Sequence, residues 1–321
     1  MYKKKLSIVL LLALVSFSIK VSAQEEKKDA EDTADATPKP KFSYFKPKIT
    51  FLSNSVYSGR KDSATLSYLS PSISYNHKSG ISIGASTSYL VNGGTNRFDA
   101  ISFDIGYDFD IMENWSAGIS GSKDFYNDSS QVFQSSTSWS LNADMSYDFD
   151  FIEVGTTGEV MFGESTQYGA GFSLARGFKF GKEDTACWTI SPTAKAGFGT
   201  QDFFHQHTRK AVKKRNQNAN IKNGIVTDIV SGSNSFSVLD YEISVPVSFD
   251  AVNWGVSFIP NYAMPVNPVT TKTKTTIYQN GVLLPQSQQP KPEFDREDLS
   301  NSFYFEIAAY WKFAAKKKTK K

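Results

Sequence analysis

The sequence predicts an all-β fold: a transmembrane antiparallel up-and-down β-barrel of about 12 strands, within a range of roughly 10 to 14. Three observations support this fold: an export signal at the N-terminus, a long region of alternating apolar and polar residues, and connections that alternate in length. The composition is of β type, with 25 Phe, 15 Tyr and 5 Trp, although the mean hydropathy is only −0.35. No apolar stretch after residue 23 is long enough for a membrane-spanning helix, which excludes a helical membrane protein.

The N-terminus has the layout of a secretory signal peptide. Residues 3–5 are lysines, residues 6–19 are largely apolar, and residues 21–23 are small. The apolar run is shorter than the roughly 20 residues that cross a bilayer, so we expect cleavage rather than anchoring. The following segment is rich in Glu, Asp, Lys and Pro, which predicts disorder. The expected organisation is a signal peptide at 1–23, a disordered periplasmic tether at 24–47, the barrel at 48–313 and a basic tail at 314–321.

The barrel strands are predicted from a period of two. In residues 101–109 the apolar side chains of Ile101, Phe103 and Ile105 fall on one face, and Asp104 and Asp108 fall on the other. The same pattern predicts twelve strands at 48–57, 64–77, 81–90, 101–109, 115–126, 139–149, 152–162, 168–180, 188–198, 239–249, 254–262 and 303–313. Four prolines inside these strands predict bulges or register breaks, at Pro71, Pro192, Pro246 and Pro260.

The connections between these strands set the expected orientation. Short turns such as 78–80 and 250–253 alternate with longer loops, of which 199–234 and 263–298 are far longer than is common in compact domains. Transmembrane barrels have short periplasmic turns and long outer loops, so both termini are expected in the periplasm.

Aromatic residues gather at the two ends of the predicted strands, as in the interfacial belts of membrane proteins. The belt at the short turns would contain Trp115, Trp188, Trp254 and Trp311. The belt at the long loops would contain Tyr57, Tyr89, Phe125, Phe162, Tyr168, Phe236 and Tyr262. A soluble β-sandwich would also alternate, but its aromatic residues would fill a core rather than form two rings.

The chain over residues 48–313 resembles the porin-like outer-membrane β-barrels of Gram-negative bacteria. Its last strand, SFYFEIAAYWKF, is similar to the aromatic-terminated signal by which such barrels are recognised for assembly. The resemblance implies the cell outer membrane as location, with outer-membrane lipid, lipopolysaccharide and the barrel-assembly machinery as partners. The chain departs from the pattern because Ala314, Ala315 and KKKTKK follow the final Phe313.

The predicted lumen is acidic. The formal net charge is +3, but four lysines lie in residues 1–23, five in residues 316–321, and six Lys or Arg without an acid in residues 209–222. Setting these fifteen positive charges aside leaves −12 for the rest of the chain. Alternation places the following residues on the inner wall: Asp104, Asp108, Asp144, Asp148, Glu153, Glu159, Asp240, Glu242 and Glu306, with Lys179, Lys195 and Lys312 against them.

Two functions fit this lumen. Twelve tilted strands would close at a backbone diameter of about 25 Å and leave roughly 10 Å or less between side chains. The sequence therefore predicts a narrow passive channel for ions or small hydrophilic solutes, with cations preferred by the carboxylates. The alternative is a plugged, non-conducting barrel with a structural or secretion-accessory role.

The basic outer loop is the second charged feature. Arg209, Lys210, Lys213, Lys214 and Arg215 would face the acidic lumen, the phosphates of lipopolysaccharide, or solvent alone. An Asn-Gly pair favours a hairpin in each long loop, at 223–224 and at 280–281, and we expect the two hairpins to lean together over the outer mouth.

Residues suited to catalysis are scarce. A lipid-modifying outer-membrane enzyme, which is the less favoured function, needs a histidine beside a serine near the outer rim. His77 lies at the opposite end, and His205 and His207 have no serine in the required place. Cys187 is the only cysteine, so no disulfide or cysteine-based metal motif forms within the chain. We therefore expect no catalytic, cofactor-binding or metal-binding residues, and no nucleic-acid partner.

Overall fold

The computed structural model describes residues 42–315, except 62–64, 93–95, 129, 131–136, 164–165, 183–184, 201–224, 232–235, 280–281, 284, 290 and 292. The predicted signal peptide and most of the predicted tether therefore lie outside the described residues. The barrel strands are β1 (Tyr44–Leu52), β4 (Ser67–Asn76), β5 (Ile81–Asn92), β6 (Arg97–Met112), β7 (Trp115–Tyr126), β8 (Thr137–Asp148), β9 (Glu153–Gly163), β10 (Thr166–Ala175) continued by β11 (Phe178–Lys182), β12 (Ala186–Ile190) continued by β13 (Thr193–Gly199), β15 (Ser237–Ser244) continued by β16 (Val247–Ala251), β17 (Trp254–Pro265) and β21 (Ser302–Trp311).

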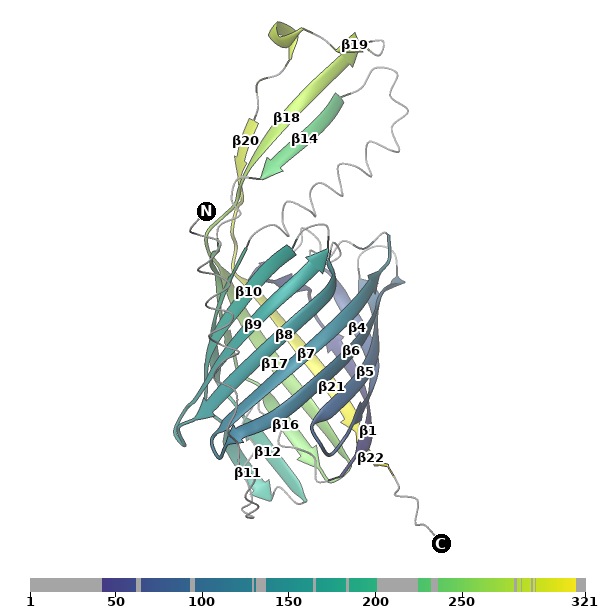
Figure 1. The fold of residues 1–321 in the computed structure, drawn as a ribbon, viewed down its shortest axis with the longest axis vertical. Coiled ribbons are helices and arrows are strands. Elements are labelled where there is room, and N and C mark those ends of the chain that lie inside the picture. Colours follow the sequence, from purple (N-terminus) through teal and green to yellow (C-terminus); the bar gives the residue numbers. More distant parts are fainter. Residues whose placement is uncertain are drawn as a thin grey trace. The chain divides into compact units, whose positions relative to one another are not determined.

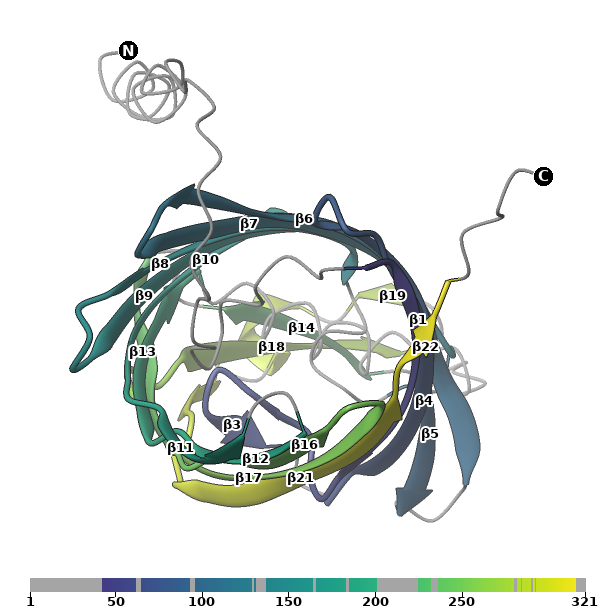
Figure 2. The ribbon, with the colours of Figure 1, turned by 90° about the horizontal axis from the view of Figure 1, so that it is seen from below.

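These strands form one closed antiparallel ring (Figures 1 and 2). Each strand pairs with the next along the chain, and the last strand, β21, pairs with the first, β1, from Lys48 opposite Tyr310 to Leu52 opposite Glu306. Closure leaves no free edge in the ring, which a strand-built membrane span requires. The predicted twelve-strand up-and-down barrel is confirmed. In the described part of the chain, no helix has the length and hydropathy of a membrane span.

Three of the twelve strands are interrupted, and two of the interruptions fall at predicted prolines. Pro192 separates β12 from β13, and Pro246 separates β15 from β16, because proline has no N–H for the ladder. The third break, between β10 and β11, lies at 176–177.

The breaks predicted at Pro71 and Pro260 are wrong. Pro71 lies inside an unbroken β4, opposite Ile49, and Pro260 lies inside an unbroken β17, opposite Phe305. The carbonyl oxygen of Pro260 still accepts a bond from Val245 N–H at 3.2 Å, so the ladder continues past this proline.

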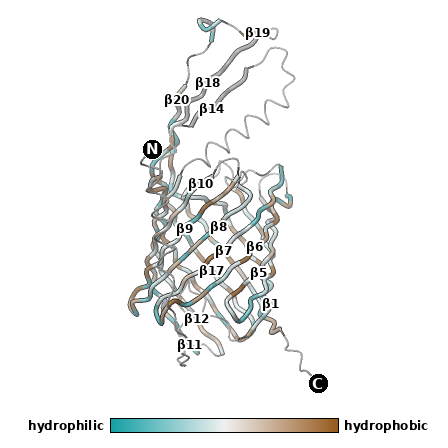
Figure 3. The backbone as a smooth tube through the Cα atoms, viewed as in Figure 1, coloured by the Kyte–Doolittle hydropathy of each residue, from teal (hydrophilic) through white to brown (hydrophobic). Residues whose placement is uncertain are grey.

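Hydrophobic and hydrophilic residues are interspersed along the barrel strands (Figure 3), and many large apolar side chains of these strands are exposed. On β6 the outward Ile101, Phe103 and Ile105 are about half exposed, although they are large and apolar. A soluble protein buries such residues, whereas a lipid-facing wall exposes them to hydrocarbon. At the short-turn end Trp254 pairs directly with Trp311. Outward aromatic residues thus occupy the levels expected of interfacial belts.

The structure moves both predicted ends of the barrel. β1 begins at Tyr44 rather than at residue 48, so residues 44–47 belong to the barrel and not to a tether. A short strand, β22 (Phe313–Ala314), pairs with the start of β1, and Ala315 N–H bonds to Ser43 O at 2.8 Å. The predicted tail from residue 314 therefore starts too early, because backbone pairing with β1 continues beyond Phe313.

The two longest loops share a second, smaller sheet (Figure 1). Its strands are β14 (Ile225–Ser231), β18 (Thr270–Gln279), β19 (Val282–Leu283) and β20 (Glu293–Arg296). β18 pairs with β14 from the other loop, and Gln279 pairs with Val282, which gives the hairpin expected around 280–281. The segment 223–224, where a second hairpin is predicted, lies outside the described residues.

Candidate functional site: a lumen narrowed by a hairpin

A hairpin between β1 and β4 lies inside the ring. It consists of β2 (Val56–Tyr57) and β3 (Arg60–Lys61), and Figure 2 shows β3 within the circle of strands. The Tyr57 hydroxyl donates to Met161 Sδ on β9 at 3.4 Å, and β9 stands half-way round the ring from β1. The hairpin therefore crosses the lumen. Tyr57 was predicted for the outer aromatic belt, which is wrong because this loop folds inward.

Arg60 fixes the hairpin to the wall at β15 and at the end of β17. Only 3% of this residue is exposed, and its guanidinium donates to the carbonyl oxygens of Leu239, Val266 and Asn267 at 3.1–3.3 Å. Arg60 Nε also donates to Glu297 Oε1 at 2.8 Å. These are charge-assisted bonds in a site with little water, so they hold the hairpin firmly.

Glycine allows the close approach that this anchor needs. Gly59 has φ of +74°, and a Cβ there would lie 2.8 Å from Asp240 Cβ and 2.9 Å from Pro265 N. A larger residue would be strained in its backbone and would clash with the wall. The turn Ser58-Gly59 therefore fits against β15 and β17 only with glycine at position 59.

The base of the hairpin rests on a small buried cluster. Leu66 and Leu90 are fully buried, and they pack with Tyr68 and with Leu52 at the end of β1. Asn54 accepts a bond from Leu66 N–H at 2.9 Å. Apolar packing at the base and the Arg60 anchor at the tip hold the loop at both ends.

Carboxylates line one side of the lumen. This acidic wall consists of Asp104, Asp108, Asp124, Asp144 and Glu159, on the inner faces of β6–β9. Gly118 makes room for two of them, because a Cβ there would meet the carboxylates of Asp144 at 2.7 Å and Asp108 at 3.0 Å. Within the described residues, Asp104, Asp108 and Asp124 form no ion pair. Glu159 also lies near Tyr57, and burial together with this charge raises the pKa of the Tyr57 phenol, so the hydroxyl stays protonated.

Lysines line the other side. Lys46 and Lys48 on β1, with Lys312 after β21, form the basic wall; β1 and β21 stand half-way round the ring from β9 and β8. Lys48 Nζ lies 3.5 Å from Glu306 Oε1. Lys46 and Lys312 lie over the ring of Tyr310, whose hydroxyl bonds to Asp250. An electric field therefore runs across the lumen from the basic wall to the acidic wall.

The remaining predicted lumen residues occupy varied positions. Glu242 accepts a bond from the Tyr304 hydroxyl at 3.1 Å and stands opposite Lys195 in the ladder. Asp148 accepts a bond from Asp150 N–H at 2.8 Å, so it stabilises a turn at the short-turn end. Glu153 is buried opposite Asp148, and Asp240 is buried beside the hairpin.

Sequence reasoning missed part of this site. Lys46 and Lys48 alternate with the apolar Phe45 and Ile49, and this signal could have placed both lysines on the inner wall. Arg60 carries no such signal. Its partner Glu297 lies 237 residues later in the chain, and only the closed ring brings the two together.

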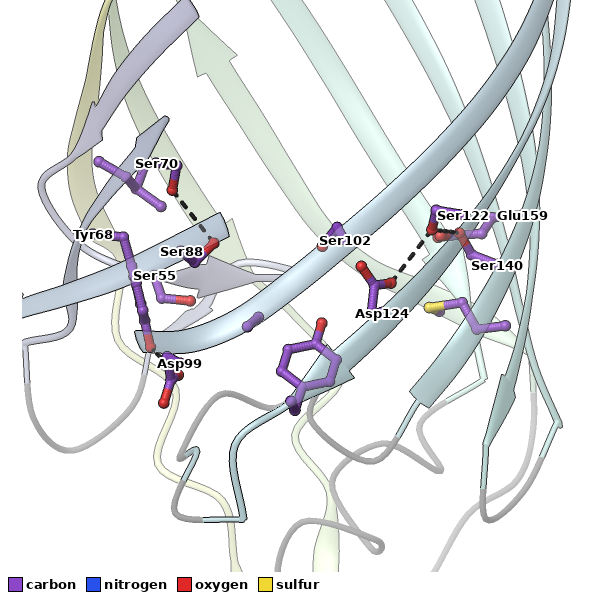
Figure 4. A pocket seen from close by; sticks show the side chains of 14 residues that line it. Ser55, Tyr68, Ser70, Ser88, Asp99, Ser102, Ser122, Asp124, Ser140 and Glu159 are labelled. Carbon is purple, nitrogen blue, oxygen red and sulfur yellow. Dashed lines mark hydrogen bonds between the residues drawn. The ribbon is translucent and has the colours of Figure 1, made fainter. Parts of the chain in front are cut away.

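A cavity of about 350 Å³ lies between the base of the hairpin and the inner faces of β4–β9 (Figure 4). Serine hydroxyls and the carboxylates of Asp124 and Glu159 line it. A smaller cavity of about 130 Å³ lies on the other side of Tyr57.

The histidines considered as catalytic candidates lie in an exposed turn or outside the described residues. His77 Nδ1 lies 2.8 Å from Ser79 Oγ, but this pair is in an exposed turn at the short-turn end. No group of three or more His, Cys, Asp or Glu that could hold a metal ion is found in the described part of the chain. The basic outer loop, with Arg209, Lys210, Lys213, Lys214 and Arg215, and both His205 and His207, lies outside the described residues.

The closed ring, the lipid-type exterior and the polar lumen define a porin-like β-barrel of the outer-membrane type. No protein-family model matches the chain, and no curated protein matches it. The fold is similar to an outer membrane channel from Pseudomonas putida F1 (8% identity, TM-score 0.29, covering 88% of this chain and 100% of that one). It is also similar to the outer membrane channel DcaP of Acinetobacter baumannii (9%, TM-score 0.27, 85% and 96%) and to OmpF of Salmonella typhi in complex with daunomycin (8%, TM-score 0.28, 84% and 97%). Similarities this low carry no argument about function, so the classification rests on the geometry of the chain itself.

Proposed function

We propose that the protein is a narrow passive channel of the outer membrane for ions and small hydrophilic solutes, with a preference for cations. The observation that carries the proposal is the hairpin, which crosses a polar lumen and is anchored by Arg60, yet leaves cavities of about 350 and 130 Å³ on its two sides. The polar cavities beside the hairpin favour a channel over a barrel that is only a plug or a scaffold.

Charge supports the cation preference. Fixed carboxylates on a low-dielectric wall attract cations strongly, and Asp104, Asp108 and Asp124 form no ion pair within the described residues. Lys48 is partly neutralised by Glu306 on the neighbouring strand β21. The acidic wall therefore outweighs the basic wall in the field that a passing ion meets.

The test is a reversal-potential measurement on the purified protein in planar bilayers under a KCl gradient. We expect discrete conducting steps and a preference for K⁺ over Cl⁻. Replacing Asp104, Asp108 and Asp124 by Asn should lower the permeability ratio by about fivefold, since a loss of ~1 kcal/mol changes a ratio by about that factor.

The control is Glu113→Gln, which removes a charge from an exposed turn rather than from the lumen. Anion preference in the unmodified protein would refute the cation proposal. A barrel that inserts without conducting would instead support the alternative, a structural or secretion-accessory role.

A further inference from the structure

The cavity between the hairpin and the acidic wall is rich in hydroxyl groups, because six serines are among its fourteen lining residues (Figure 4). Its serines come from five consecutive strands, β4 to β8: Ser70, Ser88, Ser102, Ser122 and Ser140. The hairpin adds Ser55 from the other side.

The hydroxyls are placed to bind a ligand as well as each other. Ser122 Oγ lies 2.9 Å from Ser140 Oγ, and Ser70 Oγ donates to Ser88 Oγ at 3.4 Å. Ser122 Oγ also donates to Asp124 Oδ2 at 3.3 Å, and Ser140 Oγ accepts from Asn142 Nδ2 at 3.3 Å. Since a hydroxyl has one donor and two acceptor positions, the Ser122–Ser140 pair keeps acceptor positions, and the Ser70–Ser88 pair keeps a donor as well. The Ser102 hydroxyl forms no side-chain hydrogen bond within the described residues, although it lies between these two pairs.

The cavity also has an apolar part. Leu52, Ala100 and Met161 line it beside the ring of Tyr126. A surface with hydroxyl and carboxylate groups next to apolar atoms matches a solute that has both hydroxyl and C–H faces. Such a solute can use hydroxyl groups as donors and as acceptors, whereas a bare cation can use only their oxygen lone pairs.

We propose that this cavity is a binding subsite for a neutral polyhydroxylated solute of the size of a small sugar. The volume of about 350 Å³ lies at the lower end of small-molecule sites, which run from about 300 to 1,000 Å³. Asp124 and Glu159 accept bonds from sugar hydroxyls, and the serines both donate and accept. The affinity is weak, with a dissociation constant on the order of millimolar, because a permeating solute must leave again. The inference refines the proposed channel by naming a solute class, but binding to the cavity does not depend on conduction.

Two variants isolate the hydroxyls. Ser102→Ala and Ser140→Ala each remove one hydroxyl from the cavity with little change in volume. Each loss should weaken binding by about fivefold, the value of one hydrogen bond to a neutral partner. The matched control is Ser120→Ala on β7, which removes an exposed hydroxyl from the same inner wall outside the cavity.

The experiment is calorimetric titration of the detergent-solubilised full-length barrel with sucrose, and separately with putrescine and a poly(ethylene glycol) of similar mass. We expect saturable sucrose binding that is weakened by the two cavity variants and unchanged by Ser120→Ala. The Asp124→Asn variant should retain most of the sucrose binding, because the asparagine amide still forms hydrogen bonds with sugar hydroxyls. Absence of saturable sucrose binding, or equal loss in Ser120→Ala, would overturn the subsite.

Other outcomes separate the subsite from the channel. Binding of putrescine but not of sucrose would overturn the polyol proposal in favour of a cation site. The polymer has hydrogen-bond acceptors but almost no donors. Binding of the polymer as tightly as sucrose would show that solute size alone determines binding, and it would also overturn the polyol proposal. Sucrose binding in a barrel that does not conduct would leave the subsite standing and remove the proposed channel.

Discussion

At the scale of single residues, Arg60 has the strongest individual influence on the lumen. Its guanidinium joins the inward hairpin to three carbonyl oxygens of the wall and to Glu297. Glu297 also accepts a bond from Val269 N–H at 3.1 Å, just before the strand that leaves the barrel for the outer sheet. One ion pair therefore connects the constriction to the base of the longest described loop.

Replacing Arg60 by Ala should release the hairpin. Breaking one side of a buried ion pair costs about 3–5 kcal/mol, and the free carboxylate of Glu297 would add an unpaired charge. We expect a larger and noisier single-channel conductance, with Arg60→Lys between Ala and the unmodified protein because lysine lacks the planar fork. Lys61→Ala, on an exposed neighbour in the same hairpin, is the control. Conductance that does not differ between Arg60→Ala and Lys61→Ala would show that the anchor does not hold the constriction.

At the scale of elements, the loops add structure to the twelve-strand ring, both inside the lumen and in a separate sheet. The loop between β1 and β4 turns inward, and the two longest loops pair through β14 and β18 into a common sheet. The basic segment within the first of these long loops, residues 206–222, lies outside the described residues. Its role remains one of three options: a cap over the acidic lumen, a contact to lipopolysaccharide phosphates, or a solvated segment.

Deleting residues 206–222 distinguishes the cap from the other options. If the segment caps the pore, conductance should rise at low salt and change less at high salt, because exposed charges are screened beyond about 8 Å at physiological ionic strength. Single-channel recordings of the deletion variant at two KCl concentrations measure this difference. Equal conductance of the two proteins at both concentrations would exclude the cap and leave lipopolysaccharide contact or a solvated segment.

At the scale of the whole molecule, closure of the ring dominates stability. β21 pairs with β1 and β17 over most of its length, so both ends of the chain are needed to close the barrel. Such a ring resists detergent at room temperature because every strand has two partners and opening exposes two edges at once.

The assembled protein should therefore fractionate with outer membranes and show heat-modifiable mobility in detergent gels. The unheated sample should migrate as a compact species, and boiling should convert it to the mobility of the unfolded chain. A soluble protein carried through the same fractionation serves as control. Recovery of the folded protein from the soluble periplasm would contradict the membrane location.

The sequence alone determined the barrel, because alternation and loop length are local properties of a strand-built wall. Strand number, the outward apolar face and the breaks at Pro192 and Pro246 follow from residues that are close together in the chain. The ends of the barrel were predicted less well, since Ala314 is in a strand through its pairing with Tyr44 across the closure, and residues 44–47 pair with β4 as well.

Tertiary structure alone decided what fills the lumen. Tyr57 has the pattern of a belt residue, yet it points inward, where its hydroxyl bonds to Met161 on β9 while Arg60 pairs with Glu297. The hydroxyl cavity likewise needs the register of five strands, which brings Ser122 beside Ser140 and Ser70 beside Ser88. Contacts between residues so distant in sequence depend on closure and shear of the barrel, and no local pattern encodes them.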